Sequence, residues 1–436
     1  MVTTFRSNQF NEGFEAFARR AGVLLAASMA FAWPSQAAEH KVQPGQSIAA
    51  AVTAAKPGDT VKVQRGYYAE RLVIDKPLSL IGIDRPTLAG GETGDVIRVK
   101  SADVTIEGFI VRDSGADLGQ QNAGIYVEPG ADRVVISRND LTYNLFGIWL
   151  QTVKDPRVLG NLITGKRDLQ SAQRGNGIQL YDTTGAQIIG NDISFARDGI
   201  YVDVSHHAVF RGNRTHHLRY GAHYMNSNHN VWENNESFLN RGGLALMGVR
   251  NQVVRNNRAW GNTDHGIMLR TIQDSVIENN VVAGNSRGFF VYDAEFNVLR
   301  NNLVIGNRVG VHLWAGSIHN DVDANDFIRN HEQVRFVASR DEEWGQSAGN
   351  YWSNYVGWDA DANGVGDVPY EAADLVDRLV WKHPLVKLLL NSPAVQTLRL
   401  VARQFPLLRS PSVVDRHPRM RPSRPDWSSW SGMQRD

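Results

Sequence analysis

Histidine and methionine are the residues of this chain whose types and spacing point most directly to metal chemistry. Six histidines fall within 24 residues: His206, His207, His216, His217, His223 and His229. Met225 and Met247 lie in the same region, 22 residues apart, and His207 and His229 have the same separation. Thioether sulfur and imidazole nitrogen are ligands that suit Cu(I). This region is therefore the first candidate for a metal site.

A second group of metal-type ligands lies in an aspartate-rich segment near the C-terminus. Side-chain oxygens alternate around a glycine turn, as in a calcium-binding loop, at Asp359, Asp361, Asn363 and Asp367. The segment departs from an EF-hand, because Tyr370 stands where the twelfth-position Glu would be and no helical pattern leads into it. A small Ca²⁺ site and a turn satisfied by its own backbone amides are both open.

Carboxylates with a base on one face would instead point to a polysaccharide lyase, hydrolase or epimerase. Glu128, Asp203 and Arg270 share one column of the repeat described below, but they lie several repeats apart. Asp182 and Asp203 are closer, and no obvious Arg, Lys or His base completes them. We therefore expect a protein that is not an enzyme. Polysaccharide binding or cleavage is the alternative.

The elements that carry these residues come from an internal repeat of 22 residues. Glycine recurs before an apolar pair at spacings of 22 or 23, with one of 30, at Gly124, Gly147, Gly177, Gly199, Gly221, Gly243, Gly266, Gly288 and Gly310. Asparagine recurs in step from Asn139 to Asn325. The short segments between these positions alternate apolar and polar residues, which is typical of strands.

Three short strands and their turns fill one such repeat, which is the size of a coil of a right-handed parallel β-helix. The consensus of leucine-rich repeats and the period of helical repeats are both missing. We predict an all-β solenoid of about a dozen coils over residues 39–348. The spacing of 30 predicts an insertion near 166–175, and residues 46–56 read as a short helix that caps the open end.

The repeat sorts side chains into columns. Positions +1 and +3 after each glycine are mostly Ile, Val or Leu and should point inward, so positions +2 and +4 should face solvent. Met225 and Met247 both occupy position +4, which predicts that they lie side by side on neighbouring coils, about one strand spacing apart. His223 and Met268, at position +2, should flank them.

His207 and His229 should stack in the same way at a neighbouring turn, and they complete the set of candidate copper ligands. For the methionine pair, packing beneath a loop or a partner is the open alternative, because exposed methionines also serve adaptable interfaces. His216 lies beside Phe238 and Trp260 in another outward column. There a structural or interface role is expected in preference to ligation.

Residues 1–38 have the order of a secretory signal peptide. Arg19 and Arg20 precede an apolar run from Ala21 to Trp33, and small residues follow. An uncleaved anchor is the alternative, although the run is short for a membrane span. Without cysteine, any copper must be held by methionine, histidine or oxygen. A formal net charge of +1 lacks the basic surplus of nucleic-acid binders, so no such partner is expected.

The chain changes character after the solenoid. A closing motif and the aspartate-rich loop fill 349–370, and 371–410 carries apolar residues at helical spacing. From residue 371 onward, 11 Lys or Arg stand against 6 Asp or Glu, as in basic amphipathic helices that dock on membranes or membrane proteins. A helix lying on the solenoid's own flank is the alternative. Residues 411–436 form a basic tail rich in Pro and Ser, predicted to be disordered unless bound.

The candidate docking residues are the large apolar side chains of the segment 371–410. They are Trp381, Leu388, Leu389, Leu398, Val401 and Phe405.

The chain resembles the NosD family of pectate-lyase-like, CASH-domain β-helix proteins. The likeness rests on the signal sequence, the Gly-Ile and Asn-Asn repeats and the Asp-rich loop, together with two motifs, Gly349-Asn350-Tyr351-Trp352-Ser353-Asn354-Tyr355 and Val413-Val414-Asp415-Arg416-His417-Pro418. Many proteins share such repeats, whereas the closing motif with the C-terminal helices is much more specific.

The resemblance implies a periplasmic accessory protein of denitrification, needed for maturation of nitrous oxide reductase. Its implied partners are an ABC transporter made of NosF and the membrane subunit NosY, the copper chaperone NosL, and the reductase whose copper–sulfide cluster is assembled. It supplies no ligand set that transfers residue by residue. Our hypothesis is a non-catalytic scaffold that binds Cu(I) transiently and is anchored to the inner membrane through the transporter.

Overall fold

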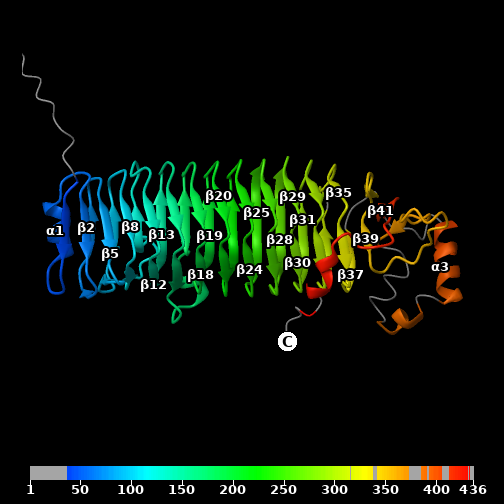
Figure 1. The fold of residues 1–436 in the computed structure, drawn as a ribbon. Helices are drawn as coiled ribbons and strands as arrows, with labels where there is room; N and C mark the ends of the chain where they lie inside the picture. The colour runs from blue at the N-terminus through cyan, green and yellow to red at the C-terminus, as the bar shows by residue number, and fades with distance from the viewer. Residues whose placement is uncertain are drawn as a thin grey trace, which may run out of the picture. The chain divides into compact units, whose positions relative to one another are not determined.

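The structure is a computed structural model that describes residues 37–314, 316–336, 341–372, 384–389, 392–404, 412–430 and 432. The predicted signal peptide lies outside these residues, except for its last two positions. Within them, short strands stack coil upon coil into three long parallel sheets (Figure 1). The fold is an all-β, right-handed parallel solenoid of about 14 turns, which confirms the predicted class.

A coil contributes a strand to sheet A, then to sheet B, then to sheet C. In the described part of the chain, sheet A has 13 strands: β1 Glu39–Val42, β2 Thr60–Val63, β5 Ser79–Gly82, β8 Thr105–Glu107, β11 Val135–Ser137, β14 Arg157–Leu159, β17 Gln187–Ile189, β20 Val209–Arg211, β23 Val231–Glu233, β26 Val253–Arg255, β29 Val276–Glu278, β32 Val298–Arg300 and β35 Asp321–Asp323. Sheet B has 13 described strands: β3 Tyr67–Tyr68, β6 Thr87–Ala89, β9 Ile110–Arg112, β12 Asp140–Asn144, β15 Leu162–Gly165, β18 Asp192–Ser194, β21 Arg214–His216, β24 Glu236–Phe238, β27 Arg258–Trp260, β30 Val281–Ala283, β33 Leu303–Ile305, β36 Asp326–Ile328 and β39 Tyr351–Trp352. Sheet C has 12 described strands: β4 Leu72–Ile74, β7 Ile97–Val99, β10 Ala123–Val127, β13 Phe146–Gln151, β16 Ile178–Tyr181, β19 Asp198–Asp203, β22 Tyr220–Met225, β25 Gly242–Arg250, β28 His265–Gln273, β31 Arg287–Tyr292, β34 Val309–Leu313 and β37 Glu332–Phe336.

Glycine and asparagine explain why the coils repeat so regularly. At the start of the sheet C strands a side chain would collide with the next coil, because a Cβ on Gly199 would lie 2.4 Å from the carbonyl oxygen of Gly221. The asparagines form a buried ladder. The Oδ1 atom of Asn235 accepts the backbone N–H and the Nδ2–H of Asn213 at 2.9 and 3.0 Å, and its own Nδ2 donates to the carbonyl of Phe210. The ladder thus satisfies polar groups buried at the turn.

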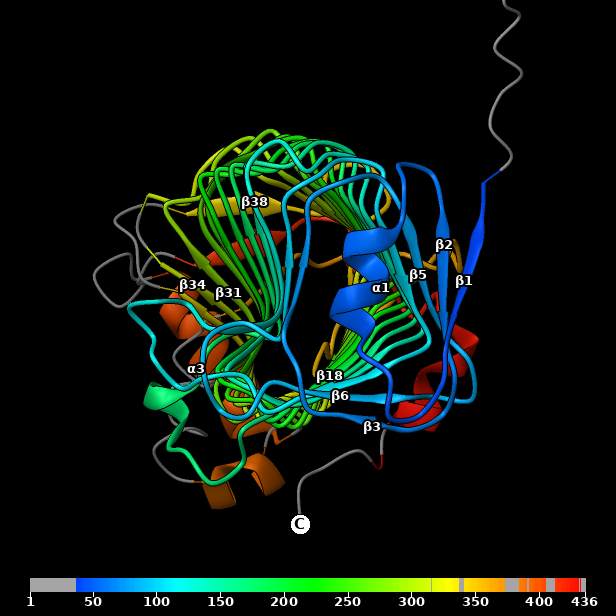
Figure 2. The same cartoon turned by 90° about the vertical axis from the view of Figure 1, so that its left-hand side faces the viewer.

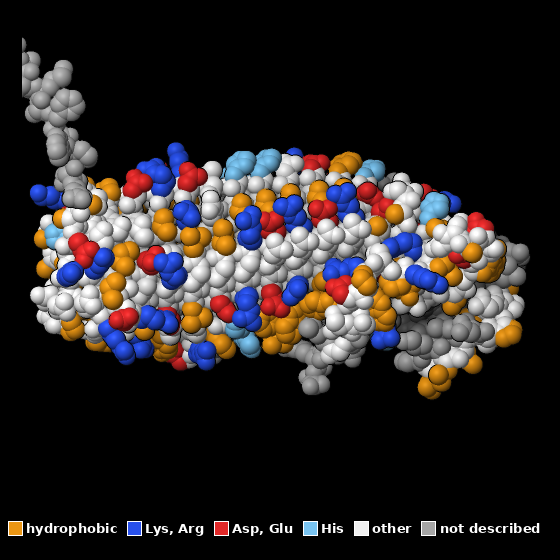
Figure 3. Space-filling model, in the orientation of Figure 1, with side chains coloured by type: hydrophobic (Ala, Val, Ile, Leu, Met, Phe, Trp, Pro, Cys, Tyr) orange, Lys and Arg blue, Asp and Glu red, His pale blue; other side chains and the backbone are white. Residues whose placement is uncertain are grey.

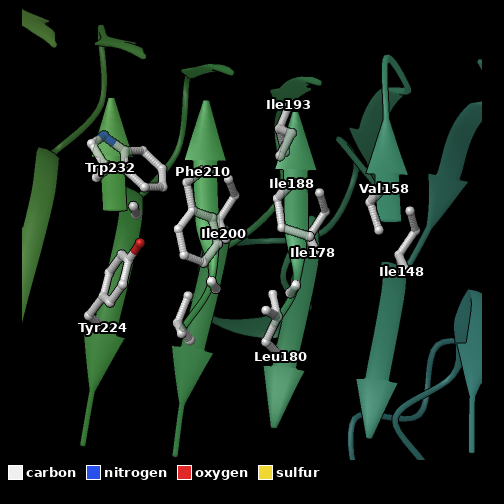
Figure 4. Packing of buried hydrophobic residues seen from close by; sticks show 14 of the residues in the cluster. Ile148, Val158, Ile178, Leu180, Ile188, Ile193, Ile200, Phe210, Tyr224 and Trp232 are labelled. Carbon is white, nitrogen blue, oxygen red and sulfur yellow. The ribbon is translucent and has the colours of Figure 1, made fainter. Parts of the chain in front are cut away.

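The core is the column of apolar side chains inside the coils. Positions +1 and +3 after the glycines are buried as predicted, for example Ile200 and Val202. Aromatic rings fill part of the interior, where the Phe210 ring centroid lies 5.2 Å from that of Trp232 and 5.4 Å from that of Tyr224 (Figure 4). This packing fixes which residues of sheet C point outward.

A short helix, α1 (Ile48–Ala54), lies across the first coils, as the sequence predicts (Figure 2). The Ser47 side chain caps the helix by accepting the N–H of Ala50, and the Glu70 carboxylate accepts the N–H of Ile48 at 2.6 Å. The helix buries Ile48 and Val52 against the core. It therefore covers apolar side chains at the first coils.

A small sheet closes the last coil, made of β38 (Glu342–Trp344), β40 (Tyr370–Glu371) and β41 (Val413–Asp415). Asp415 is fully buried in it. Its Oδ2 atom accepts the backbone N–H and the Nδ2–H of Asn350 at 2.9 and 3.0 Å, and the indole N–H of Trp352 at 2.9 Å. Asp415 therefore ends the asparagine ladder.

Residues 412–430 show that the prediction of a disordered tail is wrong for this part of the chain. After β41 the chain follows the outer side of sheet B to a 3₁₀ helix, η4 (Pro425–Trp430), whose Trp427 and Trp430 pack against a cluster that includes Ile305. Arg419 donates to the Asp326 carboxylate at 2.8 Å, across 93 positions of sequence. The amino-acid composition of the tail does not indicate that its residues contact others so far away in the sequence.

The segment 371–410 contains two described helices, η2 (Pro384–Leu389) and α3 (Pro393–Gln404), in line with its helical pattern. In the described ranges, no helix combines the length and the apolar character needed to cross a membrane. The insertion predicted near 166–175 is a loop that holds a single turn of 3₁₀ helix, η1 (Ser171–Gln173).

The outer side of sheet A carries a row of alternating charge. Arg211, Glu233 and Arg255 occupy the same register position on successive strands. Glu233 lies between the two arginines, at 2.5 Å from Arg211 and 2.7 Å from Arg255. Figure 3 shows basic and acidic side chains alternating along the solenoid. Glu233 itself is buried, which opposes its ionisation, but the hydrogen bonds from Arg255 and Arg211 outweigh burial and lower the pKa of its carboxyl.

Candidate metal centre

The structure places Met225 and Met247 at the same register position of the neighbouring strands β22 and β25. Both side chains are partly exposed on the outer side of sheet C. The hydroxyl of Tyr201, one coil earlier, donates to the Met225 sulfur at 3.2 Å. Because a thioether sulfur has two lone pairs, this hydrogen bond leaves one of them for a metal ion, and the predicted pairing of the two thioethers is present.

His223 lies two residues before Met225 on β22, with only 7% of its surface exposed. Its Nδ1 donates to the Asp198 carboxylate at 3.1 Å, and its Nε2 is buried and has no hydrogen-bond partner among the described residues. Burial opposes ionisation of Asp198, but the hydrogen bonds from Arg219 and His223 outweigh it and lower the pKa of this carboxyl. A carboxylate on one imidazole nitrogen with the other left free is the arrangement found around metal-binding histidines.

Met268 lies on β28, in register with Ala245 rather than with Met247. Ala245 in turn pairs with His223, so the small alanine side chain separates His223 from Met268. The residue that follows Met247 in its own column is Arg270. Met268 is thus a neighbour of the methionine pair and not a third member of its column.

His207 and His229 stack as the repeat predicts, with ring centroids 5.1 Å apart and planes 7° from parallel. Both are exposed and sit at turns, with φ values of 56° and 59°. They lie at the turn that leads from sheet C to the next coil, four residues beyond Asp203 and Met225 respectively. Their part in metal binding stays a prediction.

His265 is a buried histidine that the sequence analysis missed. It is fully buried at the start of β28, and neither ring nitrogen has a hydrogen-bond partner in the described part of the chain. Burial lowers the pKa of His265, against the opposing charge of Asp264. Gly242 makes room for its ring next to Tyr220, whose centroid is 5.5 Å away. The sequence signal for His265 is its position directly before the repeat glycine Gly266.

The expectation that position +2 faces solvent is wrong for most of its column. The buried members are Tyr126, Trp149, Gln179, His223, Ala245 and His312. These side chains point outward, but they pack along the solenoid against their equivalents one coil away, as in the parallel stack of Tyr126 and Trp149 with centroids 6.0 Å apart. Outward direction therefore does not mean exposure in a ladder of large side chains.

The aspartate-rich loop forms hydrogen bonds within itself. Asp359 accepts the backbone N–H of Asn363 and of Gly364 at 3.1 and 2.9 Å. Asp361 accepts the Nδ2–H of Asn363 at 2.9 Å, and Asp367 accepts the backbone N–H of Ala360 at 2.8 Å. Both alternatives for this loop contain such bonds, so the calcium site stays a prediction.

The candidate docking residues are described only in part. Leu388 and Leu389 on η2 are 84% and 55% exposed, and Val401 on α3 is also exposed. Trp381 and Phe405 lie outside the described residues, and the side chain of Leu398 does so too. The exposed leucines fit a surface that a partner could cover.

In the part of the chain that the structure describes, no three His, Cys, Asp or Glu side chains converge in an arrangement that could hold a metal ion. A site on this surface must therefore use fewer ligands or include thioethers. The methionine pair with the free Nε2 of His223 meets the second condition, and these donors fit Cu(I).

Two known proteins match most of the chain. A protein of Pseudomonas aeruginosa named "Probable ABC transporter binding protein NosD" is 41% identical over 371 residues, which is 82% of this chain and 87% of that protein. The chain belongs to the NosD family. A protein of Stutzerimonas stutzeri with the same name is 34% identical and covers 83% of this NosD-family chain and 86% of its own.

The family model, described as "Periplasmic copper-binding protein (NosD)", matches residues 159–357 of this NosD-family chain. The match spans the coils that carry the methionine pair. Among solved structures, PfbA, a surface adhesin of Streptococcus pneumoniae, has a TM-score of 0.51 at 11% identity and covers 70% of this chain and 87% of its own. That likeness shows the fold alone.

Proposed function

We propose that this chain is a non-catalytic periplasmic accessory protein that works with an ABC transporter and handles Cu(I) for the copper–sulfide cluster of nitrous oxide reductase. The names of its relatives and the description of its family support the transporter link, the periplasmic location and the metal. The observation that carries the copper assignment is the register of Met225 with Met247, together with His223 on the strand of Met225, whose Nε2 has no hydrogen-bond partner among the described residues.

Cu(I) is cargo in this proposal. Thioethers bind it without releasing a proton, so binding by the methionine pair depends little on pH. His223 is held by Asp198 with its Nε2 lone pair free, and it would supply the nitrogen ligand. A site with few ligands at the surface can pass its ion on, because an incoming ligand finds an open position.

The partners are proposed from the family. The NosY subunit, with NosF, would receive the exposed leucines of η2 and the apolar side of α3, NosL would deliver copper, and the reductase would receive it. The exposed side chains of Leu388 and Leu389 on η2 and of Val401 on α3 have the apolar character of an interface core. The inner-membrane association of the protein would then be indirect, through the transporter.

The experiment is a Cu(I) titration of the mature protein without oxygen, against a competing chelator. The double variant Met225→Leu/Met247→Leu keeps the apolar volume and removes both sulfurs. Its affinity for Cu(I) should fall at least about 10-fold, because even the loss of a residue that only supports a metal ligand has an effect of this size. Its thermal stability should be unchanged. Met420→Leu, which removes a partly exposed methionine of the tail, is the matched control. Unaltered affinity in the double variant would sink the ligand assignment.

The polysaccharide alternative has its own readout. Uronic-acid polymers incubated with the protein should show no chain cleavage and no unsaturated product. Turnover of such a polymer would overturn the non-catalytic assignment.

A further inference from the structure

Two consecutive histidines at the end of β21 point their ring nitrogens at each other. The Nδ1 atoms of His216 and His217 are 2.7 Å apart. His216 is the last residue of β21 in sheet B, and His217 begins the turn toward sheet C with a φ of 58°. This left-handed backbone is what turns two consecutive side chains to one side of the chain.

The proton positions at this pair follow from Asp192. Its Oδ1 atom lies 2.9 Å from the Nε2 of His216, and Arg214 donates to its Oδ2 at 2.8 Å. A carboxylate held by arginine accepts hydrogen bonds, so Nε2 of His216 carries the hydrogen. The Nδ1 of His216 is then a bare lone pair directed at His217. A carboxylate behind one imidazole nitrogen and an open lone pair on the other is the arrangement of a metal ligand.

Aromatic packing holds the His216 ring. It stacks on Phe238 with centroids 4.9 Å apart, and Phe238 stacks on Trp260 at 4.7 Å. This ladder runs along the outer side of sheet B.

A second ladder holds the His217 ring. It stacks on Phe195 at 5.1 Å, and the guanidinium of Arg167 from the inserted loop lies 4.0 Å from the Phe195 centroid. The two histidine rings meet nearly at right angles, 80° between planes. The geometry therefore results from two independent stacks, not from one flexible turn.

We propose that His216 and His217 hold one Cu(I) ion between their two Nδ1 atoms. The inference rests on the proposed function, since it requires that the protein meets Cu(I), and it adds a second site of different ligand chemistry. Cu(I) accepts two neutral imidazole nitrogens in a nearly linear arrangement. Zn²⁺ requires about four ligands in structural sites, and among the described residues no three His, Cys, Asp or Glu side chains form a group that could hold a metal ion.

Binding requires one proton to move and none to leave. In the free pair the Nδ1–H of His217 donates to His216. On binding, that hydrogen leaves Nδ1 and Nε2 of the same exposed ring takes one up from water, so both Nδ1 lone pairs face the ion. The two nitrogens must separate beyond their hydrogen-bond distance, and the exposed ring of His217 makes this movement while it stays stacked on Phe195. His216 and Met225 belong to consecutive strands of one coil, so both copper sites lie on that coil.

The test uses the mature protein, Cu(I) without oxygen, a competing chelator and X-ray absorption at the copper edge. Asparagine tolerates positive φ, so His217→Asn removes the ring with little strain. Its matched control is His319→Asn, because His319 is also exposed, has a φ of 58° and stacks on Phe296 at 5.2 Å. We expect His217→Asn to lose one Cu(I) equivalent and the two-nitrogen signal, and His319→Asn to lose neither.

Asp192 is a positioning residue. Asp192→Asn should keep the two-nitrogen signal and lower the affinity of that site about 10-fold, because the carboxylate that orients the His216 ring is lost.

The double methionine variant distinguishes the methionine site from the histidine site. Met225→Leu/Met247→Leu should lose the copper–sulfur signal and keep the two-nitrogen one, which supports both sites. If it loses all copper, the proposed function stands and the histidine site is overturned. If His217→Asn keeps every equivalent with an unchanged spectrum, the histidine site is likewise overturned. If the wild-type protein binds no Cu(I), both proposals fail together.

Discussion

The Nδ1 atom of His223 lies 3.1 Å from the Oδ2 atom of Asp198, one coil earlier in sheet C. Two guanidinium nitrogens of Arg219 also donate to this carboxylate, Nε to Oδ1 at 2.8 Å and Nη2 to Oδ2 at 2.5 Å. Asp198 itself is fully buried. The orientation of a residue on the candidate copper face thus depends on an ion pair beneath the surface.

Asp198→Asn should therefore destabilise the protein by about 3 kcal/mol, because a guanidinium loses its buried partner. It should also release the His223 ring from a single orientation and weaken Cu(I) binding. Chemical denaturation measures the first effect and chelator competition the second. Asp203→Asn, at a partly exposed carboxylate of the same strand, is the control and should change stability by less than about 0.5 kcal/mol. Equal effects in both variants would contradict the buried ion pair.

His312 should make stability depend on pH. Burial, with the positive charges of Arg287 and Arg335, lowers its pKa from 6.5 to about 4. The unfolded chain therefore takes up a proton at a higher pH than the folded one, so this contribution is present above pH 6.5 and is lost as the pH falls through about 4. His312→Gln should flatten that part of the Tm-against-pH curve, as differential scanning calorimetry would measure. An unchanged slope of Tm against pH in this variant would contradict the contribution of His312.

The tail should come off the solenoid when its tryptophans are removed. Trp427 and Trp430 pack on the sheet B cluster, with Arg329 and Arg258 over their rings at 5.1 and 5.5 Å. Trp427→Ala/Trp430→Ala should lower the free energy of tail docking by about 2 kcal/mol and speed hydrogen exchange in 423–430. Trp358→Ala, at a ring that is 63% exposed, should leave that exchange unchanged. Slow exchange in the double variant would mean that the tryptophans do not hold the tail.

Charge on η2 should block docking without unfolding the solenoid. Leu388 and Leu389 are exposed, so Leu388→Glu/Leu389→Glu should change Tm little and abolish co-purification with the transporter. Buried apolar anchors of an interface contribute about 2 kcal/mol or more each, which is enough to dissociate a complex of moderate affinity. Leu118→Glu, at an exposed leucine of an early coil, is the control. A complex that survives the double variant would place docking elsewhere.

The periodic residues made the fold and one site relationship predictable. The glycine and asparagine columns set the register, and the register places Met225 beside Met247. The exposure of positions +2 was predicted wrongly, because large side chains of adjacent coils bury one another. The alternation of residues within one coil does not show this contact between coils. His265 was missed because its column precedes the glycine that defined the repeat. The contact of Arg419 with Asp326 joins distant segments and follows from no local pattern.

The ladder asparagines join one coil to the next through their backbone N–H and Nδ2–H groups. At the last coil, the carboxylate of Asp415 accepts both of these hydrogen bonds from Asn350. Synthesis starts at the N-terminus, so the residue that terminates the ladder is made after all the coils that need it. A chain cut short before Asp415 would present a buried amide and an unpaired strand edge at its last coil. A chain without Asp415 therefore cannot close the solenoid, and the open end that it exposes distinguishes it from a chain that contains Asp415.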